Sequence, residues 1–335
     1  RLIDQTKLPY EYVTVDIKSY LEMEEAIKNM LIRGAPAIGV AGAFGFVLGA
    51  QYYETVCSDI DDFTYNMAKV GGVLKAARPT AVNLEWAVNI LDNYITKHQD
   101  KPISEIVRGL RVLAKNIHKE DLESCYKIGE YGADLITKKG AAILTHCNAG
   151  GLATVGYGTA LGVIRSAYKK DPGIKVYADE TRPRQQGSRL TVWELMQDKI
   201  NTTLLTDGMC AHLMSRGMID YIVVGADRIA SNGDAANKIG TLTLAIVANE
   251  YKIPFFIAAP LSTIDLNIPD GLHIPIEERD SDEIKIINNH YICPENTKVY
   301  NPGFDVTPAK FISAIITEKR VLRPEFKSNI SKVFP

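Results

Sequence analysis

Cysteine is scarce in this chain, and its copies follow no pattern. The five cysteines are widely spread, with no CxxC pair and no Cys/His cluster at zinc spacing: Cys57, Cys125, Cys147, Cys210 and Cys293. An odd number of scattered cysteines is not the framework of a disulfide-stabilised secreted domain or of a structural zinc site. We therefore expect a cytoplasmic protein that binds no metal.

The chain also lacks an excess of charge and a long apolar run. Its 38 Lys and Arg residues against 40 Asp and Glu give a net charge of −2, with no block of five or six like charges. A chain with this balance of charge has no general electrostatic attraction for nucleic acid or an anionic membrane. The most apolar window, residues 35–50, contains Pro36 and is shorter than the roughly 20 residues that a membrane span needs. We interpret this window as a buried helix and expect no membrane or nucleic-acid partner.

What the chain does have is the composition of an ordinary globular protein. Hydrophobic residues make up 46% and charged residues 23% of its 335 residues. These values exclude a disordered or fibrous protein, and the length argues for two domains. A change in hydrophobic period places the boundary near residue 125, which gives domains 1–125 and 126–335.

The first domain is predicted to be mainly helical. Its first 20 residues alternate apolar and polar side chains, which is typical of a short hairpin or edge strand. From residue 22 to about 139, apolar residues recur every three and four positions, as in an amphipathic helix. Breaks at residues 33–36, 78–79 and 101–102 carry proline, as helix ends often do.

The second domain is predicted to be an α/β domain with a Rossmann-like, doubly wound parallel sheet. Short apolar runs alternate with helical stretches, which is typical of strands joined by crossover helices. The expected strands are 141–145, 175–178, 202–205, 221–225 and 254–258. The expected helices are 152–169, 189–198, 209–216 and 238–251.

Polar residues follow the strands of this sheet, where α/β proteins bind their ligands. Cys147 lies between a strand end and an expected helix start, where a helix dipole would favour the thiolate. Asp227 follows an apolar strand, where burial would raise its pKa and suit it to act as a general acid. Two other interpretations stay open: Cys147 is an inert buried cysteine, or Asp227 pairs with Arg228 or caps a helix.

Several segments are suited to a phosphate or a sugar hydroxyl. Arg33, Gly34 and Ala35 precede Pro36 at an expected helix start, where a guanidinium and free amides can bind an anion. The other candidates are Arg78-Pro79-Thr80 and Asn237-Lys238, with solvated surface charges as the alternative. The glycines after Asn148 lack GxGxxG spacing, which favours a phosphosugar over a dinucleotide.

These segments together resemble one known family. The motifs are RGAPAIG at 33–39, residues 145–158, DETRPRQQGSRL at 179–190, GADRI at 225–229, NKIGT at 237–241 and NPGFDVTP at 301–308. In this order they resemble methylthioribose-1-phosphate isomerase, a family related to the alpha, beta and delta subunits of the translation factor eIF2B. The resemblance covers residues 3–324.

The resemblance implies an enzyme of methionine salvage that acts without a cofactor. It would convert 5-methylthioribose 1-phosphate to 5-methylthioribulose 1-phosphate as a homodimer, with Cys147 and Asp227 as catalytic residues. The implied substrate-binding residues are Arg33, Gly34, Ala35, Arg78, Gln186, Asn237 and Lys238. An acid such as Asp227 would protonate the ring oxygen, since the anomeric phosphate locks the ring. Hydrogen would then move from C2 to C1, by proton transfer through Cys147 or by a hydride shift.

Three alternatives stay open. Ribose 1,5-bisphosphate isomerase has a similar pattern but must hold a second phosphate at C5. Activity on 5-deoxyribose 1-phosphate would overlap with the methylthio substrate. A non-catalytic regulatory subunit like those of eIF2B is a different class of protein, and such a subunit has no chemical need for both Cys147 and Asp227.

Overall fold

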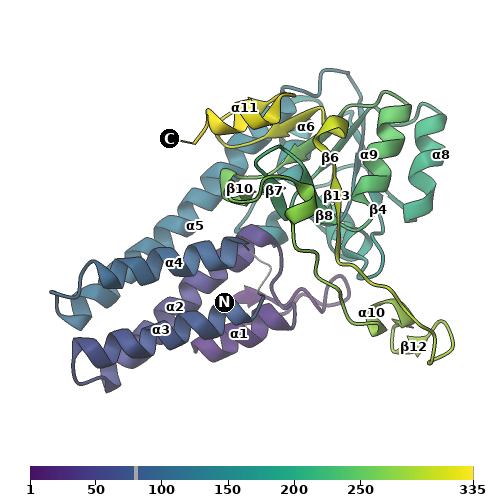
Figure 1. Ribbon diagram of the computed structural model, residues 1–335. Coiled ribbons are helices and arrows are strands. Elements are labelled where there is room, and N and C mark those ends of the chain that lie inside the picture. Colours follow the sequence, from purple (N-terminus) through teal and green to yellow (C-terminus); the bar gives the residue numbers. More distant parts are fainter. Residues whose placement is uncertain (79–81, 335) are drawn as a thin grey trace. The chain divides into compact units, whose positions relative to one another are not determined.

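The computed structural model describes residues 1–78 and 82–334, so the candidates Pro79 and Thr80 lie outside the described residues. The chain divides into two compact units (Figure 1). The first comprises Arg1–Ser124 and Leu152–Gly156, and the second comprises Cys125–Gly151 and Tyr157–Pro335.

The first unit is helical, as predicted, and begins with the expected hairpin. Strands β1 (Leu2–Ile3) and β2 (Thr14–Val15) pair antiparallel. The side chains of Ser19 and Asp59 accept backbone amides at the starts of α1 and α3, which supplies the usual N-caps. The helices are α1 (Tyr20–Lys28), α2 (Ala35–Val56), α3 (Ile60–Ala76), α4 (Val82–Thr96) and α5 (Ile103–Ala133), the last of which continues into the second unit.

Helix α2 forms the core of the helical unit, as expected for residues 35–50. It is the one helix among the described residues that is long and apolar enough to cross a membrane, but 72% of its most apolar window is buried inside the protein. Small residues let neighbouring helices approach it closely. A Cβ at Gly39 would lie 2.8 Å from the Asn83 carbonyl oxygen, and one at Gly42 would lie 2.4 Å from Leu84 Cδ1. Gly39 and Gly42 therefore allow α4 to pack closely against α2.

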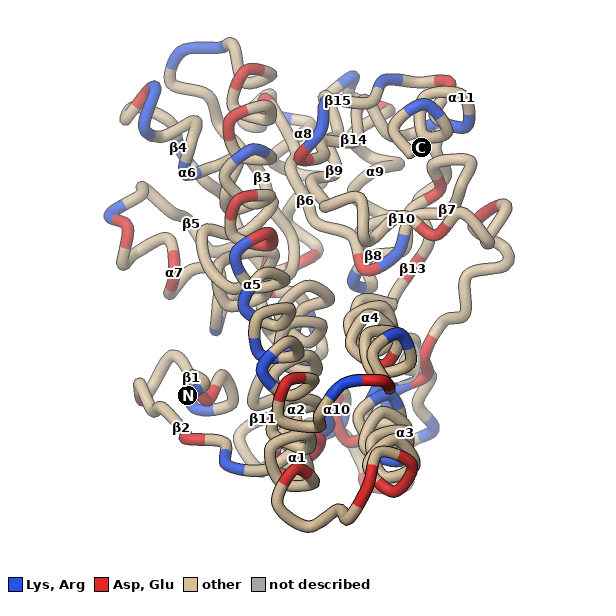
Figure 2. The backbone as a smooth tube through the Cα atoms, turned by 90° about the vertical axis from the view of Figure 1, so that its left-hand side faces the viewer, with Lys and Arg blue, Asp and Glu red and all other residues tan. Residues whose placement is uncertain are grey.

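Helix α5 has a solvated face. Lys and Arg interleave with Asp and Glu along it (Figure 2). Its buried residues recur at helical spacing, among them Ile106, Leu110 and Ile117. The charge pattern and the apolar stripe thus lie on different faces of the same helix.

A seven-stranded sheet forms the centre of the second unit, in the order β15-β14-β9-β6-β3-β4-β5. All neighbours are parallel except the β14–β15 pair. This confirms the α/β class and all five predicted strands. The bounds are β3 (Ala142–Thr145), β4 (Lys175–Asp179), β5 (Thr202–Leu205), β6 (Tyr221–Val224), β9 (Phe255–Ala258), β14 (Ala314–Ile316) and β15 (Val321–Leu322).

A second sheet, which no sequence pattern predicted, has the order β10-β7-β8-β13. Its strands are β7 (Arg228–Ala230), β8 (Ala235–Lys238), β10 (Ile264–Asp265) and β13 (Phe304–Thr307). The helix expected at 238–251 is therefore wrong at its start: Lys238 ends a strand, and α9 spans Thr241–Glu250. Pairing of β8 with both β7 and β13 fixes its extended backbone.

The helix expected at 152–169 is also wrong in its first half. A single turn, η1 (Gly151–Ala153), follows the strand loop, and α6 (Ala160–Lys170) begins later. Tyr157 and Gly158 between them have φ of 64° and 82°, which a right-handed helix does not accommodate. Residues Leu152–Gly156 therefore leave the sheet unit and pack within the helical unit.

The remaining elements of the second unit are short. They are η2 (Gly187–Thr191), α7 (Val192–Gln197), η3 (Asp207–Met209), α8 (Cys210–Ser215), η4 (Leu261–Thr263), η5 (Gly271–His273), α10 (Asp282–Lys285), β11 (Ile286–Ile287), β12 (His290–Tyr291), η6 (Ala309–Phe311) and α11 (Phe326–Ser331).

Candidate active site

Cys147 and Asp227 follow neighbouring strands at the point where the strand order reverses. After β3 the chain continues to β4 on one side of it, whereas β6 lies on the other side, with Leu144 opposite Ile222. In open α/β sheets the crevice at such a switch point is the usual ligand site. The topology therefore places both residues after the carboxyl ends of adjacent strands.

The backbone of Cys147 is held in an unusual conformation by two threonines. Its φ is 63°, in the left-handed region that residues other than glycine seldom adopt. Its amide donates to Thr181 Oγ1 at 2.8 Å, and its carbonyl accepts from Thr191 Oγ1 at 2.6 Å. Such a backbone costs on the order of 1–3 kcal/mol and persists where its surroundings fix it, often at functional sites.

Glu194 holds the rest of the Cys147 loop. This buried carboxylate accepts from Asn148 Nδ2 at 3.0 Å and from the Gly151 amide at 2.7 Å. Arg165 donates to it at 3.0 Å. A Cβ at Gly150 would lie 2.4 Å from Glu194 Oε1, so the loop lies directly on the carboxylate. Charge-assisted bonds of this kind are among the stronger ones in proteins.

The helix-dipole argument for Cys147 is wrong as it stands, because the next long helix in the chain starts well after the thiol. Helix α6 begins at Ala160, and the amides of Thr159 and Leu161 at its start donate to the carbonyl of Ala149. The start of α6 thus fixes the loop through its backbone rather than through the sulfur.

Asp227 lies at the junction of the two sheets. Its amide donates to the Ala236 carbonyl at 2.9 Å, which places it beside strand β8. The neighbouring Arg228 forms an ion pair with Asp265 at 3.2 Å. Asp227 therefore lies next to the strand that carries Asn237 and Lys238.

Lys238 is buried, so it is not the solvated surface charge of the alternative interpretation. Only 9% of the residue is exposed. Its ammonium donates to the Gly303 carbonyl at 2.7 Å and lies 4.3 Å from the centre of the Phe304 ring, a cation–π contact. Strand β13 pairs Phe304 with Lys238 and Asp305 with Asn237. The NPGFDVTP motif therefore serves to hold this lysine.

Asn237 and the start of α9 are engaged by protein groups. Asn237 Nδ2 donates to Thr241 Oγ1 at 2.9 Å. The amides of Gly240 and Leu242 donate to the carboxylate of Asp305. Burial raises the pKa of Asp305, and these two amide bonds oppose that rise. The first amides of α9 are therefore occupied by an internal anion.

Gln186 is buried at the end of a loop that also contains a glycine-dependent turn. It is 5% exposed, and its Oε1 has no hydrogen-bond partner within the described part of the chain. The next residue, Gly187, begins a π-helical turn, and a Cβ there would lie 1.7 Å from the Asp179 carbonyl oxygen. Such turns are frequent at functional sites.

The remaining predicted residues belong to the helical unit. Arg33 is only 7% exposed, so it is not a solvated surface charge. Gly34, with φ of 97°, caps α2, whose first residue is Ala35; a Cβ at Gly34 would lie 2.5 Å from the backbone of Ala153. Arg78 Nη1 lies 3.4 Å from the sulfur of Met30, three residues before Arg33. Arg78 therefore lies beside the segment that leads into Arg33, Gly34 and Ala35.

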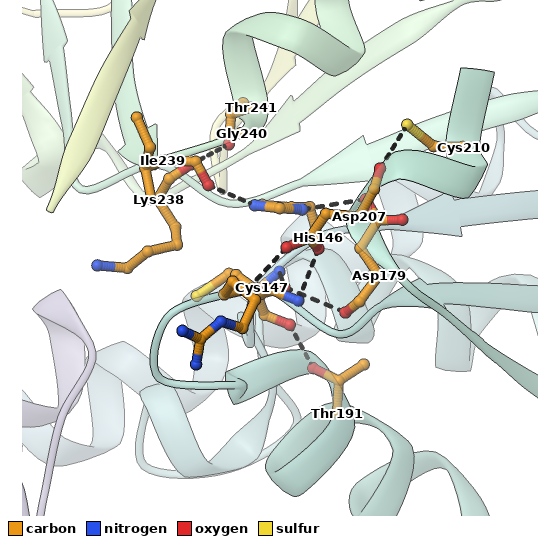
Figure 3. Close-up of polar contacts among 12 residues, drawn as sticks. His146, Cys147, Asp179, Thr191, Asp207, Cys210, Lys238, Ile239, Gly240 and Thr241 are labelled. Atoms are coloured by element: carbon orange, nitrogen blue, oxygen red, sulfur yellow. Dashed lines mark hydrogen bonds and ion pairs between the residues drawn. The ribbon is translucent and has the colours of Figure 1, made fainter. Parts of the chain in front are cut away.

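A buried network beside Cys147 was not predictable from local sequence patterns (Figure 3). His146 Nδ1 lies 3.0 Å from Asp179 Oδ2, and its Nε2 lies 2.8 Å from the Ile239 carbonyl oxygen. Asp207 accepts from the amides of Thr181 and Arg182. The partners are 33 and 93 residues from His146 along the chain, so no local spacing could have revealed them.

This network also has the ligand types of a metal site. One atom from each of His146, Asp179 and Asp207 lies within 4.8 Å of the others. Most of the nitrogen and oxygen atoms already have protein partners, and only Asp179 Oδ1 lacks one among the described residues. Burial raises the pKa of the nearby Cys210 thiol to about 11. Internal hydrogen bonds therefore account for the arrangement.

Comparison with known proteins identifies the family of the chain. The model of the Initiation factor 2 subunit family matches residues 31–324. A methylthioribose-1-phosphate isomerase of Acetivibrio thermocellus is 52% identical, over 99% of this chain and 96% of its own length. The crystal structure of 5-methylthioribose 1-phosphate isomerase from Pyrococcus horikoshii has a TM-score of 0.90 and 45% identity, over 99% of this chain and 92% of its own.

A second solved structure bears a different name. It is described as translation initiation factor eIF-2B, subunit delta, from A. fulgidus, with a TM-score of 0.86 and 44% identity, covering 99% of this chain and 96% of that one. Both solved structures share the fold of this chain over 99% of its length. The chain belongs to the Initiation factor 2 subunit family and, within it, to the methylthioribose-1-phosphate isomerases.

Proposed function

We propose that the protein is an aldose–ketose isomerase that converts 5-methylthioribose 1-phosphate to 5-methylthioribulose 1-phosphate in methionine salvage. The observation that carries the proposal is the placement of Cys147 and Asp227 after the neighbouring strands β3 and β6, at the switch point. The names of relatives at about half identity over nearly the whole chain support the same activity.

Asp227 is proposed as the acid that opens the ring. A proton delivered to the ring oxygen breaks its bond to C1, and C1 becomes electrophilic. Hydrogen then moves from C2 to C1, while the C2 hydroxyl loses its proton and becomes the ketone. The phosphate stays on C1 throughout, so no cofactor has to supply or remove electrons.

Two routes for the hydrogen are compatible with a thiol at this position. In one, the Cys147 thiolate removes the C2 proton and returns it to C1 through an enolate. In the other, the hydrogen of C2 shifts directly to C1 as a hydride, and Cys147 lines the site. Deuterium at C2 separates them, because exchange with water occurs in the first route and not in the second.

We propose that three cationic side chains hold the phosphate. Lys238, Arg33 and Arg78 supply positive charge, and Gly34 and Ala35 lie at the start of a long helix, a common anion site. Gln186 and Asn237 are proposed to bind sugar hydroxyls; the Oε1 of Gln186, which has no partner among the described residues, supports this, because an unsatisfied buried acceptor is costly. Positioning of this kind supplies part of the catalytic effect.

We also propose a cytoplasmic homodimer. None of the five cysteines forms a disulfide bond among the described residues, which fits a reducing compartment. Light scattering at low micromolar concentration tests the assembly: a mass near twice 37.0 kDa supports the dimer, and a mass near 37.0 kDa contradicts it.

A regulatory role is the second candidate, favoured by the likeness to the A. fulgidus structure described as an eIF-2B subunit. The experiment that separates the candidates is 31P NMR of the purified protein with 5-methylthioribose 1-phosphate, 5-deoxyribose 1-phosphate and ribose 1,5-bisphosphate, each with EDTA and without nucleotide. Preference for the methylthio sugar supports the proposal. Preference for ribose 1,5-bisphosphate changes the substrate, and inertness of the folded protein toward all three favours the regulatory role.

A further inference from the structure

His146 joins the backbone beside the proposed catalytic thiol to the backbone beside the proposed phosphate-binding lysine. It directly precedes Cys147, and its Nε2 bonds the carbonyl of Ile239, which directly follows Lys238. Cys147 comes from the end of β3 and Lys238 from the end of β8, in different sheets. Figure 3 shows the Cys147 sulfur and the Lys238 ammonium on the same side of the His146 ring.

The ring fits its place tightly. The side chains of His146 and Asp179 are each 1% exposed. A Cβ at residue 240 would lie 2.9 Å from His146 Cε1, and Gly240 has φ of 103°, so glycine is required there for the ring to lie against the turn. The imidazole therefore has one orientation, with one nitrogen toward each partner.

The hydrogen bonds fix the number of protons on the His146–Asp179 pair. A carbonyl oxygen only accepts, so Nε2 carries a proton. The hydrogen bond between Nδ1 and Asp179 Oδ2 needs a second proton, which is located either on the imidazole or on the carboxyl group. Both forms have no net charge, which suits a buried pair.

The surroundings favour retention of that proton. Burial by itself would lower the pKa of His146, but the hydrogen bond and charge of Asp179, the Ile239 carbonyl and the charge of Asp207 together outweigh burial and raise it. Burial also raises the pKa of Asp179. The other titratable groups that act on the pair are acids or a thiol: Glu180, Asp207, Cys210 and Asp305. Loss of the proton would add a buried negative charge among them.

We propose that His146 is a positioning residue, which sets the distance between the Cys147 thiol and the Lys238 ammonium through its bonds to Ile239 and Asp179. The inference rests on the proposed function for the roles of Cys147 and Lys238. A substrate anchored by its phosphate presents C2 to the thiol only if that distance is kept, and a shift of about 1 Å can cost on the order of 10²-fold in rate.

The test compares His146→Asn with Asp179→Asn. The shorter amide in His146→Asn reaches Asp179 but not Ile239, so we expect kcat to fall at least 30-fold while KM changes less than threefold. The amide in Asp179→Asn is neutral and still bonds the Nδ1 atom, so we expect kcat within threefold of wild type. His146→Gln, whose amide reaches the Ile239 carbonyl, is expected to stay within tenfold and serves if His146→Asn does not fold. Wild-type kcat in His146→Asn, or a loss in Asp179→Asn as large as in Cys147→Ser, would overturn the inference.

A second measurement needs no substrate. Alkylation of Cys147 by iodoacetamide is followed by mass spectrometry of its peptide, with His273→Asn as control, because His273 forms an exposed pair with Asp270 at 2.7 Å. We expect at least a threefold faster reaction in His146→Asn and less than a twofold change in Asp179→Asn and His273→Asn. Equal rates in His146→Asn and wild type contradict the inference. If the variants show these alkylation rates but the wild-type protein does not convert any of the sugar phosphates, the proposed function is overturned and the inference about His146 stands.

Discussion

Thr181 accepts the backbone amide of Cys147, and both residues have left-handed backbones, with φ of 64° and 63°. One follows β4 and the other follows β3, the adjacent strand. Left-handed residues other than glycine are uncommon, and two that bond each other at the same sheet edge indicate a loop shaped for function. Substitutions in this loop and in its neighbours should therefore affect turnover more than stability.

Replacement of Cys147 by serine should lower kcat at least 100-fold. A serine hydroxyl fits the same backbone, but it does not ionise near neutral pH, and general acid–base groups typically contribute 10²- to 10⁴-fold. Initial rates from 31P NMR measure the effect. Cys293→Ser, on a partly buried cysteine after β12, is the control and should keep wild-type kcat. Wild-type turnover in Cys147→Ser would remove the thiol from the mechanism.

Replacement of Asp227 by asparagine should lower kcat by a similar factor, because an amide cannot protonate the ring oxygen. The control is Asp220→Asn at the opposite end of strand β6, where Asp220 accepts the Ala142 amide at 2.9 Å. Asp220→Asn should lower the free energy of unfolding by about 1 kcal/mol and change kcat little. Equal kcat values in the two variants would contradict the role of Asp227.

Replacement of Lys238 by methionine should raise KM at least tenfold and change kcat less. Methionine has a length similar to that of lysine and can still cover the Phe304 ring, but it lacks the charge that we propose binds the phosphate in ground and transition states alike. Lys310→Met is the matched control, because Lys310 lies over the ring of Phe311 at 5.0 Å on an exposed surface. A KM that stays at the wild-type value in Lys238→Met would exclude this lysine from phosphate binding.

Asp121 should make the protein less stable as pH rises from about 4 to 6. Burial raises the pKa of this α5 carboxylate to about 6, although the Val155 amide donates to it at 2.9 Å and opposes the rise. The folded state therefore holds the proton more tightly than the unfolded state, whose carboxyl has a pKa of about 4. The resulting stability is complete below pH 4 and lost as pH passes through 6, by about 1–3 kcal/mol.

Urea unfolding at pH 4.5 and pH 7 measures this loss. Asp121→Asn has no proton to lose, so its free energy of unfolding should rise relative to wild type between the two pH values. Glu120→Gln, on an exposed neighbour in the same helix, should show no such change. A difference between Asp121→Asn and wild type that stays constant with pH would show that the carboxyl titrates normally.

The parts of the fold that local patterns determine were predictable from the sequence. The runs around Leu144 and Val223 are apolar and short, which identified the buried strands, and proline marked the start of α2. Strand β8 was missed because its sequence, AANK, has no β preference. Its conformation depends on pairing with β13, whose Phe304 lies opposite Lys238, 66 residues away.

The candidate site divides in the same way. Cys147 and Asp227 each come two residues after a predicted strand, so their placement at the same edge of the sheet could be inferred. The partners of His146 and the three bonds to Glu194 could not, because each joins residues at least 29 positions apart. The departure of Leu152–Gly156 into the helical unit depends on long-range contacts, such as the bond from Gln5 Nε2 to the Leu152 carbonyl at 2.7 Å.

The most direct test of the central claim compares wild type with the double variant Cys147→Ser/Asp227→Asn on 5-methylthioribose 1-phosphate. Both are shown to be folded by circular dichroism, and the ketose product is followed by NMR with EDTA present. We predict steady conversion by wild type and none detectable with the double variant. A folded wild type that leaves the sugar phosphate unchanged, or a double variant as active as wild type, would contradict the account.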